Sequence, residues 1–418
     1  MSFINSLDTD FSNLKELREK ALTSFKALGI PTPKNEEWKF TNIKKLFDVD
    51  YTKGAKSKLS NEQVQDVFIP GLEGNKIVFV NGEFKAELST INPSNLEIST
   101  FAEAANKSSE VFAKYYAKQS NIDDEAISAL NTAYAQDGVF IYVPKNKVVE
   151  ETTTLYFITD ATTENVVSYP RNLIVVEENS QAKFVEVYKT IGSNNSLCNP
   201  ISEVFVGKSA IVEHFKLQND VETASQLSSI NVDQSTSSVF KQHTYSFKGD
   251  VIRNNLTHTL NGEHIESHMN GLYLLDGSTH VDNHTNVDHK FPNCESHELY
   301  KGILDDKSRG VFNGKVFVRK DAQKTNAFQS NRNVLLSDSA TINTKPQLEI
   351  WADDVSCSHG CTIGQLDKEA LFYMNARGIG RQKAQALLMS AFAIEVIDRI
   401  SIEALKVHVE GIIEARLG

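Results

Sequence analysis

The chain has 418 residues, and its 43 basic and 54 acidic side chains give a formal net charge of −11. Hydrophobic residues make up 40% and charged residues 23%, with 9 prolines and 21 glycines, which excludes a disordered, collagen-like or coiled-coil chain. The acidic balance argues against a protein that binds duplex nucleic acid, because such a protein needs a basic face for the phosphates. The length allows two or three domains, or one elongated domain.

The sequence carries no sign of secretion or membrane insertion. A basic segment followed by an apolar core is absent from the N-terminus, so we expect no secretory signal. The most apolar stretch, Ala384–Ile400, is interrupted by polar and charged residues and is too polar to span a bilayer. Four cysteines are too few for a disulfide framework in a chain of this size, so we expect a cytoplasmic protein with reduced thiols.

The first third of the chain is predicted to be a mixed, mainly helical region. Apolar residues at helical spacing predict an N-terminal helix with Leu7, Phe11, Leu14, Ala21, Phe25 and Leu28 on one face. Gly29 and the prolines that follow end this helix. A second helical zone covers about 101–135, and the strand-like run Ile77–Gly82 closes with an Asn-Gly turn. We assign residues 1–137 to this region.

Short β-strands dominate the middle of the chain. From Gly138 onward, runs rich in Val, Ile, Phe, Tyr and Thr replace the helix formers, as in Val139–Pro144 and Lys315–Asp321. Many of these runs lie beside a polar turn, and the turn serines recur at a nearly constant interval, with one gap a little over twice as long, at Ser180, Ser209, Ser278, Ser308 and Ser339. This regular interval favours a solenoid of stacked coils, a parallel β-helix, over residues 138–360. A jelly-roll or immunoglobulin-type sandwich remains the alternative.

The last part of the chain, residues 361–418, is predicted to be helical. Asp367 is placed to cap a first helix, and Gly378 lies just past its end. A second helix over about 381–399 is apolar around most of its circumference, and Ser401 is placed to cap a third. A helix of that kind must be covered, either by its own domain or by a partner.

Two groups of residues offer metal-binding chemistry. Seven of the eleven histidines fall between His258 and His297, but their spacings match no compact ligand motif, and side-chain ladders on a polar strand face explain them as well. The second group is Cys357, His359 and Cys361, whose thiols and imidazole suit iron, copper or zinc. No second ligand pair accompanies it, so the site is open or shared with another chain, unless these residues form a tight turn with buried thiols. The sequence contains no phosphate-binding glycine loop and no nucleophile elbow.

Four segments resemble the SufB/SufD family, which builds iron–sulfur clusters together with the ATPase SufC. The longest begins NRNVLLSDSATINTKPQLEIWADDVSCSHGCTIGQ, and the four together are Pro31–Ile43, His280–Leu304, Gly310–Asn331 and Asn331–Arg381. The resemblance implies an N-terminal α/β region, a right-handed parallel β-helix core and a C-terminal helical region. SufB-type chains have EHEA at Ser358–Gly360 and a cluster-building cysteine near Ser337–Pro346, where this chain has none. The SufD-type branch is therefore the better match.

The resemblance implies a role as well as a fold. It implies a non-enzymatic scaffold in a complex with a SufB-type paralogue and a SufC-type ATPase that drives it, holding no stable cofactor alone and a transient iron–sulfur cluster in the complex. His359 is then the residue assigned to the shared nascent-cluster site at the SufB interface, Cys357 the second, and Cys361 an uncertain third, since family members more often have Ala or Thr there. We expect SufC to dock on the C-terminal helices, at Phe372, Tyr373, Met374 and Arg377. A homodimer of the isolated chain is also possible, and neither nucleic acid nor membrane is expected as a partner.

Two other classes of function remain open from the residues. A carbohydrate-active β-helix enzyme needs paired carboxylates on one face of the solenoid, and the adjacent Asp353 and Asp354 are the only tempting pair. Adjacent strand residues point to opposite faces, which counts against them. A self-sufficient metalloprotein could instead use the histidines between His258 and His297.

Overall fold

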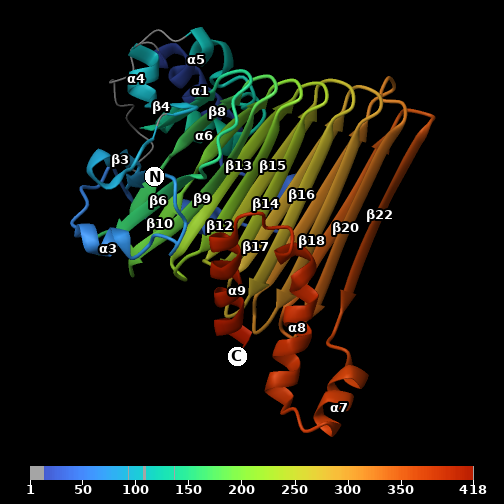
Figure 1. Ribbon diagram of the computed structural model, residues 1–418. Helices are drawn as coiled ribbons and strands as arrows, with labels where there is room; N and C mark the ends of the chain where they lie inside the picture. The colour runs from blue at the N-terminus through green and yellow to red at the C-terminus, as the bar shows by residue number, and fades with distance from the viewer. Residues whose placement is uncertain (1–13, 93, 107–109, 136, 418) are drawn as a thin grey trace.

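A parallel β-solenoid forms the centre of the computed structural model, which describes residues 14–417 except 93, 107–109 and 136 (Figure 1). One sheet, here sheet A, contains β4 (Glu97–Thr100), β5 (Gly138–Val143), β8 (Arg171–Val176), β11 (Ile201–Val206), β13 (Ala224–Gln234), β15 (Val251–Leu260), β17 (His280–His289), β19 (Arg309–Val318) and β21 (Thr341–Ile350). The short strands β1 (Thr52–Lys53), β7 (Val166–Ser168) and β10 (Ser196–Cys198) pair at its side.

Sheet B forms the opposite wall of the solenoid. It contains β3 (Glu83–Phe84), β2 (Asn75–Val80), β6 (Thr153–Ala161), β9 (Gln181–Gly192), β12 (Ile211–Asn219), β14 (Val239–Lys248), β16 (Glu266–Leu275), β18 (Glu295–Leu304), β20 (Thr325–Leu335) and β22 (Val355–Gly364). The chain alternates between the two sheets, so within the solenoid a strand pairs in parallel with the strand one coil earlier and the strand one coil later. The short strands β3 and β4 instead pair antiparallel with β2 and β5.

The coil length explains the spacing of the turn serines. In sheet A, Val251 is in register with His280, and His280 with Arg309, so these two successive coils have the same length. In sheet B, Glu295 is in register with Asn326, which makes that coil slightly longer. The predicted parallel β-helix is therefore confirmed, and the sandwich alternative is wrong because its strands would pair antiparallel.

One corner of the coil repeats the same backbone conformation. Just before a strand of sheet B, one residue adopts a left-handed backbone conformation with φ between 56° and 60°, and this recurs at Asn179, Ser209, Ser237, His264, Asn293 and Lys324. Left-handed conformations are costly for residues other than Gly, Asn and Asp, so each corner depends on the hydrogen bonds of the coils around it. Asn179 N–H, for example, donates to the Lys208 carbonyl, and Ser209 N–H to the Thr236 carbonyl.

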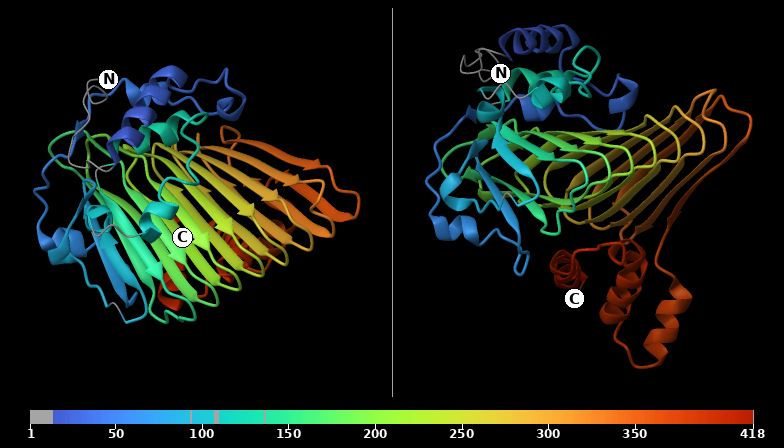
Figure 2. Two further views of the ribbon diagram at one scale, coloured as in Figure 1. Left: turned by 90° about the horizontal axis from the view of Figure 1, so that it is seen from above. Right: turned by 45° about the horizontal axis from the view of Figure 1, so that its top comes forward.

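Helices cover the two outer faces of the solenoid. On sheet A lie α1 (Lys15–Leu28) and α6 (Ala126–Tyr134), with α4 (Phe101–Asn106) and α5 (Glu110–Tyr115) at the N-terminal end. The short elements α2 (Lys44–Phe47), α3 (Asn61–Gln65), η3 (Glu36–Trp38) and η4 (Ala86–Leu88) complete this region. On sheet B lie α8 (Arg381–Ile397) and α9 (Glu403–Leu417), while α7 (Lys368–Ala376) extends beyond the solenoid (Figure 2).

Most of the predicted elements are present. The N-terminal helix is confirmed from Lys15, and Gly29 follows it with φ 70°, while Leu7 and Phe11 lie outside the described residues. The strand before the Asn-Gly turn is β2. The side chain of Asp367 accepts hydrogen bonds from the backbone N–H groups of Glu369 and Ala370, so the predicted cap of α7 is confirmed.

A buried ion pair ties the N-terminal region to sheet A. The Arg253 guanidinium lies 2.7 Å from the Asp282 carboxylate, and both side chains are almost fully buried. The Trp38 ring lies 3.9 Å from that guanidinium, and Thr41 Oγ1 donates a hydrogen bond to Asp282. Burial opposes ionisation, but Arg253 and His284 together hold the pKa of Asp282 well below its usual range. The loop around η3 is thus held down by charge as well as by packing.

Removing Asp282 should therefore destabilise the fold strongly. In Asp282→Ala, Arg253 stays buried without its counter-charge, and we expect the free energy of unfolding to fall by about 3–5 kcal/mol in urea titrations followed by circular dichroism. The matched control is Asp398→Ala, which breaks the exposed pair with Lys406 and should lower the free energy of unfolding far less. Equal losses in the two variants would contradict this role of the buried pair.

Candidate functional site

The C-terminal end of the solenoid is open. Among the described strands, β22 pairs only with β20 and β21 only with β19, so each has one edge on which backbone N–H and C=O groups have no strand partner. An unpaired edge of this kind is a template for another chain. The last coils lie at the opposite end of the molecule from the N-terminal helices (Figure 2).

Cys357, His359 and Cys361 lie on one face of β22. They are in register with Ala327, Gln329 and Asn331 of β20, which are buried inside the solenoid. In-register residues of parallel strands point to the same side, so the two thiols and the imidazole face the lumen. No further coil of the described chain covers them, and Cys357 is half-buried while His359 and Cys361 are exposed. The alternative of a tight turn with buried thiols is wrong, because this segment is a regular strand.

The strand geometry limits what these residues can bind together. Cys357 and Cys361 are four residues apart on an extended strand, so their Cα atoms are about 13 Å apart. Two thiolates that share one metal ion must each reach within about 2.3 Å of it, which this separation prevents. Only two pairs are close enough to bind the same metal ion, Cys357 with His359 and His359 with Cys361. His359 belongs to both pairs. Among the described residues no group of three or more His, Cys, Asp or Glu could hold a metal ion, so any site here is incomplete.

Burial changes the acidity of two of the thiols. Burial raises the pKa of Cys357, which keeps this thiol protonated at neutral pH in the isolated chain. Burial raises the pKa of Cys198, in the solenoid interior, to about 12, which makes that thiol a poor nucleophile and a poor metal ligand. Cys198 is therefore not a candidate ligand.

The C-terminal helices form a second candidate surface. None of the nine described residues of α7 is buried, and the side chains of Phe372 and Tyr373 are 75% and 59% exposed. The guanidinium of Arg377 lies 5.0 Å from the centre of the Tyr373 ring, and Met374 is half-buried. Three of the residues predicted to contact a partner thus lie on a helix with no buried residue, and Arg377 lies at its C-cap.

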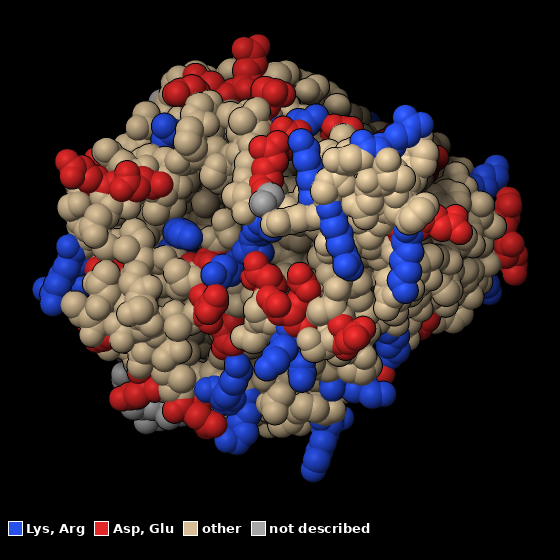
Figure 3. Space-filling view, turned by 90° about the horizontal axis from the view of Figure 1, so that it is seen from below, with Lys and Arg blue, Asp and Glu red and all other residues tan. Residues whose placement is uncertain are grey.

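The broad apolar surface of α8 is divided between two roles. Its inner face packs on sheet B through Met389, Ala393, Val396 and Ile397. Leu387 and Ile394 on its outer face are 46% and 52% exposed. Acidic and basic side chains are interspersed over the face that contains these helices when the molecule is seen from below (Figure 3).

Comparisons with known proteins agree with these features. The family described as "SUF system FeS cluster assembly, SufBD core domain" matches residues 157–392, and the "SufBD protein N-terminal region" matches residues 5–155. The chain belongs to the SufBD family. The predicted resemblance is thereby confirmed, including its extent over most of the chain.

Three relatives of this SufBD chain align along nearly their whole length. It is 32% identical to an iron–sulfur cluster assembly SufBD family protein of Synechocystis, over 98% of this chain and 92% of the relative. It is 29% identical to the iron–sulfur cluster assembly protein SufD of Escherichia coli, over 93% of this chain and 90% of the relative. The SufD of Bacillus subtilis is 26% identical, over 97% and 94%.

The histidine-rich part of the SufBD core does not form one site. His258 and His289 face the lumen, His280 and His284 lie on the outer face of sheet A, and His264 lies in a corner. His268 and His297 stack on the outer face of sheet B with ring centres 5.3 Å apart, and Phe328 continues the stack. The histidines are thus spread over three faces and one corner, so they do not form a self-sufficient metal centre. The stacked rings of His268 and His297 support the alternative of side-chain ladders on a strand face.

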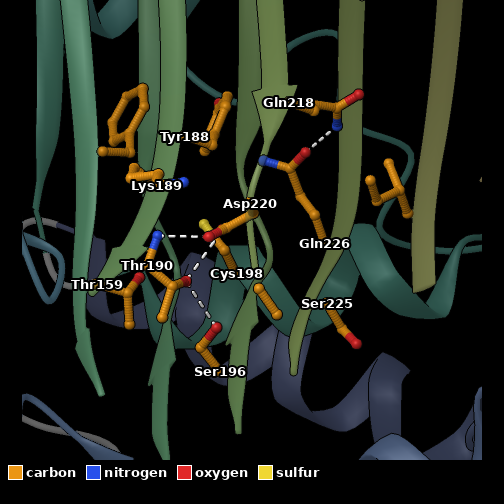
Figure 4. Close-up of a pocket in the computed structure, with 13 residues that line it drawn as sticks. Thr159, Tyr188, Lys189, Thr190, Ser196, Cys198, Gln218, Asp220, Ser225 and Gln226 are labelled. Atoms are coloured by element: carbon orange, nitrogen blue, oxygen red, sulfur yellow. Dashed lines mark hydrogen bonds between the residues drawn. The ribbon is translucent and has the colours of Figure 1, made fainter. Parts of the chain in front are cut away.

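Other polar groups inside this SufBD chain have structural roles. A cavity of about 20 Å³, the size of one water molecule, lies among Thr190, Ser196, Cys198 and Asp220 in the lumen (Figure 4). Thr190 donates its backbone N–H to Asp220, and its hydroxyl bonds to both Asp220 and Ser196. Asp353 and Asp354 lie in the loop before β22, where both backbone N–H groups donate to the Gln323 side chain. No helix of the described chain is long and apolar enough to cross a membrane.

The buried histidines predict how stability depends on pH. Burial lowers the pKa of His258 to about 3 and that of His289 to about 4. In the unfolded chain a histidine has a pKa near 6.5. Between the folded and the unfolded pKa, the unfolded state therefore binds more protons than the folded state. The stabilisation is present above about pH 6.5 and is lost as the pH falls, by up to about 1.4 kcal/mol per pH unit and residue.

The measurement is urea unfolding between pH 7 and pH 5. In His258→Asn the loss of stability over this range should be smaller than in the wild type, since one titrating group is gone. His264→Asn is the control, because His264 is exposed in a corner whose left-handed backbone suits asparagine. An unchanged slope in His258→Asn would show that His258 does not contribute.

Proposed function

We propose that the chain is a non-enzymatic scaffold subunit of an iron–sulfur cluster assembly complex, in which a SufB-type paralogue and a SufC-type ATPase are its partners. Membership of the SufBD family and the similarity to two proteins named SufD support this role. The observation that carries the proposal is the open end of the solenoid, where His359 lies on a lumen-facing strand with an incomplete set of ligands. Its four free cysteines fit a reducing cytoplasm.

His359 is the ligand that we assign to the nascent-cluster site. It is exposed, it lies on the last strand, and it neighbours a thiol on either side. The missing ligands would come from the SufB-type paralogue, which would pair with the open edges of β21 and β22. A neutral imidazole suits a cluster that is handed on, because it binds iron without a permanent charge and stays exchangeable. We assign no cluster to the isolated chain, whose open edge could instead pair with a second copy.

The SufC-type ATPase would dock on α7 and the outer face of α8. Phe372, Tyr373, Met374 and Arg377 offer exposed aromatic, sulfur and guanidinium groups, which are the side chains enriched at the centres of protein interfaces. Lys301 donates to the Phe392 carbonyl and pairs with Glu395, which attaches α8 to β18. Movement of the ATPase could therefore be transmitted through α8 to the solenoid.

Replacing His359 tests the cluster site. In His359→Ala we expect normal assembly of the complex and normal ATP hydrolysis, but roughly tenfold less iron and sulfide recovered on the purified complex, because a ligand is lost. Iron and acid-labile sulfide are measured after anaerobic purification. Cys361→Ala should have a much smaller effect, because His359 can still act with Cys357.

The matched control is His297→Ala, which removes a partly exposed histidine from the outer face of sheet B. Cluster content should be unchanged in this variant. If His359→Ala complexes carry a normal amount of iron and sulfide, the site assignment is wrong and His359 is only a strand residue.

Replacing two residues of α7 tests the docking surface. In Phe372→Asp/Met374→Asp we expect the SufC-type ATPase to be lost from the co-purified complex, because two charges enter an apolar contact. The circular dichroism spectrum and the urea midpoint should stay the same, since α7 lies outside the core. Phe291→Asp, at an exposed phenylalanine in a corner of the solenoid, is the control that should retain the ATPase. Unfolding of the double variant, or full retention of the ATPase, would count against the docking surface.

A further inference from the structure

A column of side chains runs along the lumen to His359. Glu298 of β18 is in register with Gln329 of β20, and Gln329 is in register with His359 of β22. Neighbouring strands of a sheet are about 4.8 Å apart, so the three side chains stack as consecutive steps. Glu298 and Gln329 are 4% and 3% exposed, whereas His359 stands at the open end.

Glu298 and Gln329 are held together by hydrogen bonds. Thr285 Oγ1 donates to Glu298 Oε2 at 2.6 Å, and Gln329 Nε2 donates to the same oxygen at 3.3 Å. Gly314 of β19 leaves room for the amide, because a Cβ at this position would collide with Gln329 Nε2. The amide of Gln329 is thus held from two sides, with its nitrogen toward β18.

The oxygen of this amide has no partner. Gln329 Oε1 is buried and accepts no hydrogen bond from the described residues. A buried carbonyl without a donor costs about 1–3 kcal/mol, so its persistence needs a reason. The amide nitrogen is engaged on the β18 side, and the next side chain on the other side is His359. An imidazole N–H on that side would supply the missing donor.

We propose that Gln329 is the positioning residue for His359, with its Oε1 accepting the imidazole N–H that is left when the other ring nitrogen binds the cluster. Metal-binding histidines almost always donate their second N–H to such an acceptor, which fixes the tautomer and the ring orientation. Glu298 and Thr285 orient the amide so that its oxygen faces β22. The inference rests on the proposed function of His359 and adds the residues that orient its imidazole.

The test uses the assembled complex and Co²⁺ as a spectroscopic probe. Co²⁺ is titrated anaerobically into complexes without cluster, and its visible absorption bands report binding to nitrogen and sulfur ligands. Gln329→Met keeps the length of the side chain and removes the acceptor, and we expect the Kd for Co²⁺ to rise at least about tenfold. Glu298→Gln/Gln329→Glu exchanges the two groups, so that the amide of residue 298 donates to the carboxylate of residue 329. The exchange again places an oxygen beside His359, and Kd should return to within about threefold of the wild-type value.

A matched control separates positioning from packing. Asn331→Leu removes the next buried amide on the same face of β20, which donates to Tyr273 and to the Tyr300 carbonyl and is in register with Cys361. It should lower the melting temperature without changing Kd for Co²⁺. Equal weakening by Asn331→Leu and Gln329→Met, or no recovery in the exchanged pair, overturns the inference.

The same titration distinguishes failure of the inference from failure of the proposed function. If His359→Ala binds Co²⁺ as tightly as the wild type, His359 is not a ligand and the proposed site fails. If His359→Ala loses binding while Gln329→Met retains it, His359 is a ligand but Gln329 does not position it.

Discussion

Parallel, in-register stacking of coils is the constraint on which the rest of the structure depends. Each strand satisfies its backbone groups with the coil before it and the coil after it, so the last coil is left with unpaired edges at β21 and β22. The same stacking arranges side chains in columns, because in-register residues of parallel strands share a face. A lumen-facing residue on the last strand of the solenoid is therefore exposed because no further coil of the described chain follows it. His359 is accessible for this reason, while Gln329, one coil earlier, is buried.

The columns explain how a polar lumen is tolerated. Glu186 accepts hydrogen bonds from Ser202 and Tyr188 and lies 3.2 Å from His214, and although burial favours its neutral form, the neighbouring His214 and Lys216 lower the pKa of Glu186 to about 2. Burial lowers the pKa of Lys216 to about 8, and its ammonium group, which has no hydrogen-bond partner among the described residues, lies 5.2 Å from the centre of the Tyr188 ring. Buried polar groups cost little when each finds a partner in its own or the next coil. At the open end, a polar group of the last coil lacks the partner that a following coil would provide.

The sequence predicted the architecture because its signals are local. Turn serines at a nearly constant interval mark the coils, Asp367 caps α7, and Gly29 ends α1. The faces of the histidines could not be predicted, because the side on which a strand residue points depends on register. The coils vary in length, and a shift of register by a single position moves every following side chain to the other face. Gln329 lies one coil before His359, so the length of a coil could have indicated that the two are neighbours. A single glutamine among many polar residues, however, gives no reason to select it.

The covered walls of the solenoid differ from two parts of the chain that remain exposed or unpaired. The solenoid walls are covered by α1 and α6 on one side and by α8 and α9 on the other, and both cores are buried. The two exposed parts are α7, with Phe372 exposed, and the unpaired edge of β22, with His359 exposed. An exposed apolar helix and an unpaired strand edge both favour association, but by different forces, apolar burial and backbone hydrogen bonding. The two surfaces therefore differ in chemistry as well as in place, and α8 and α9 pack on the sheet to which β22 belongs.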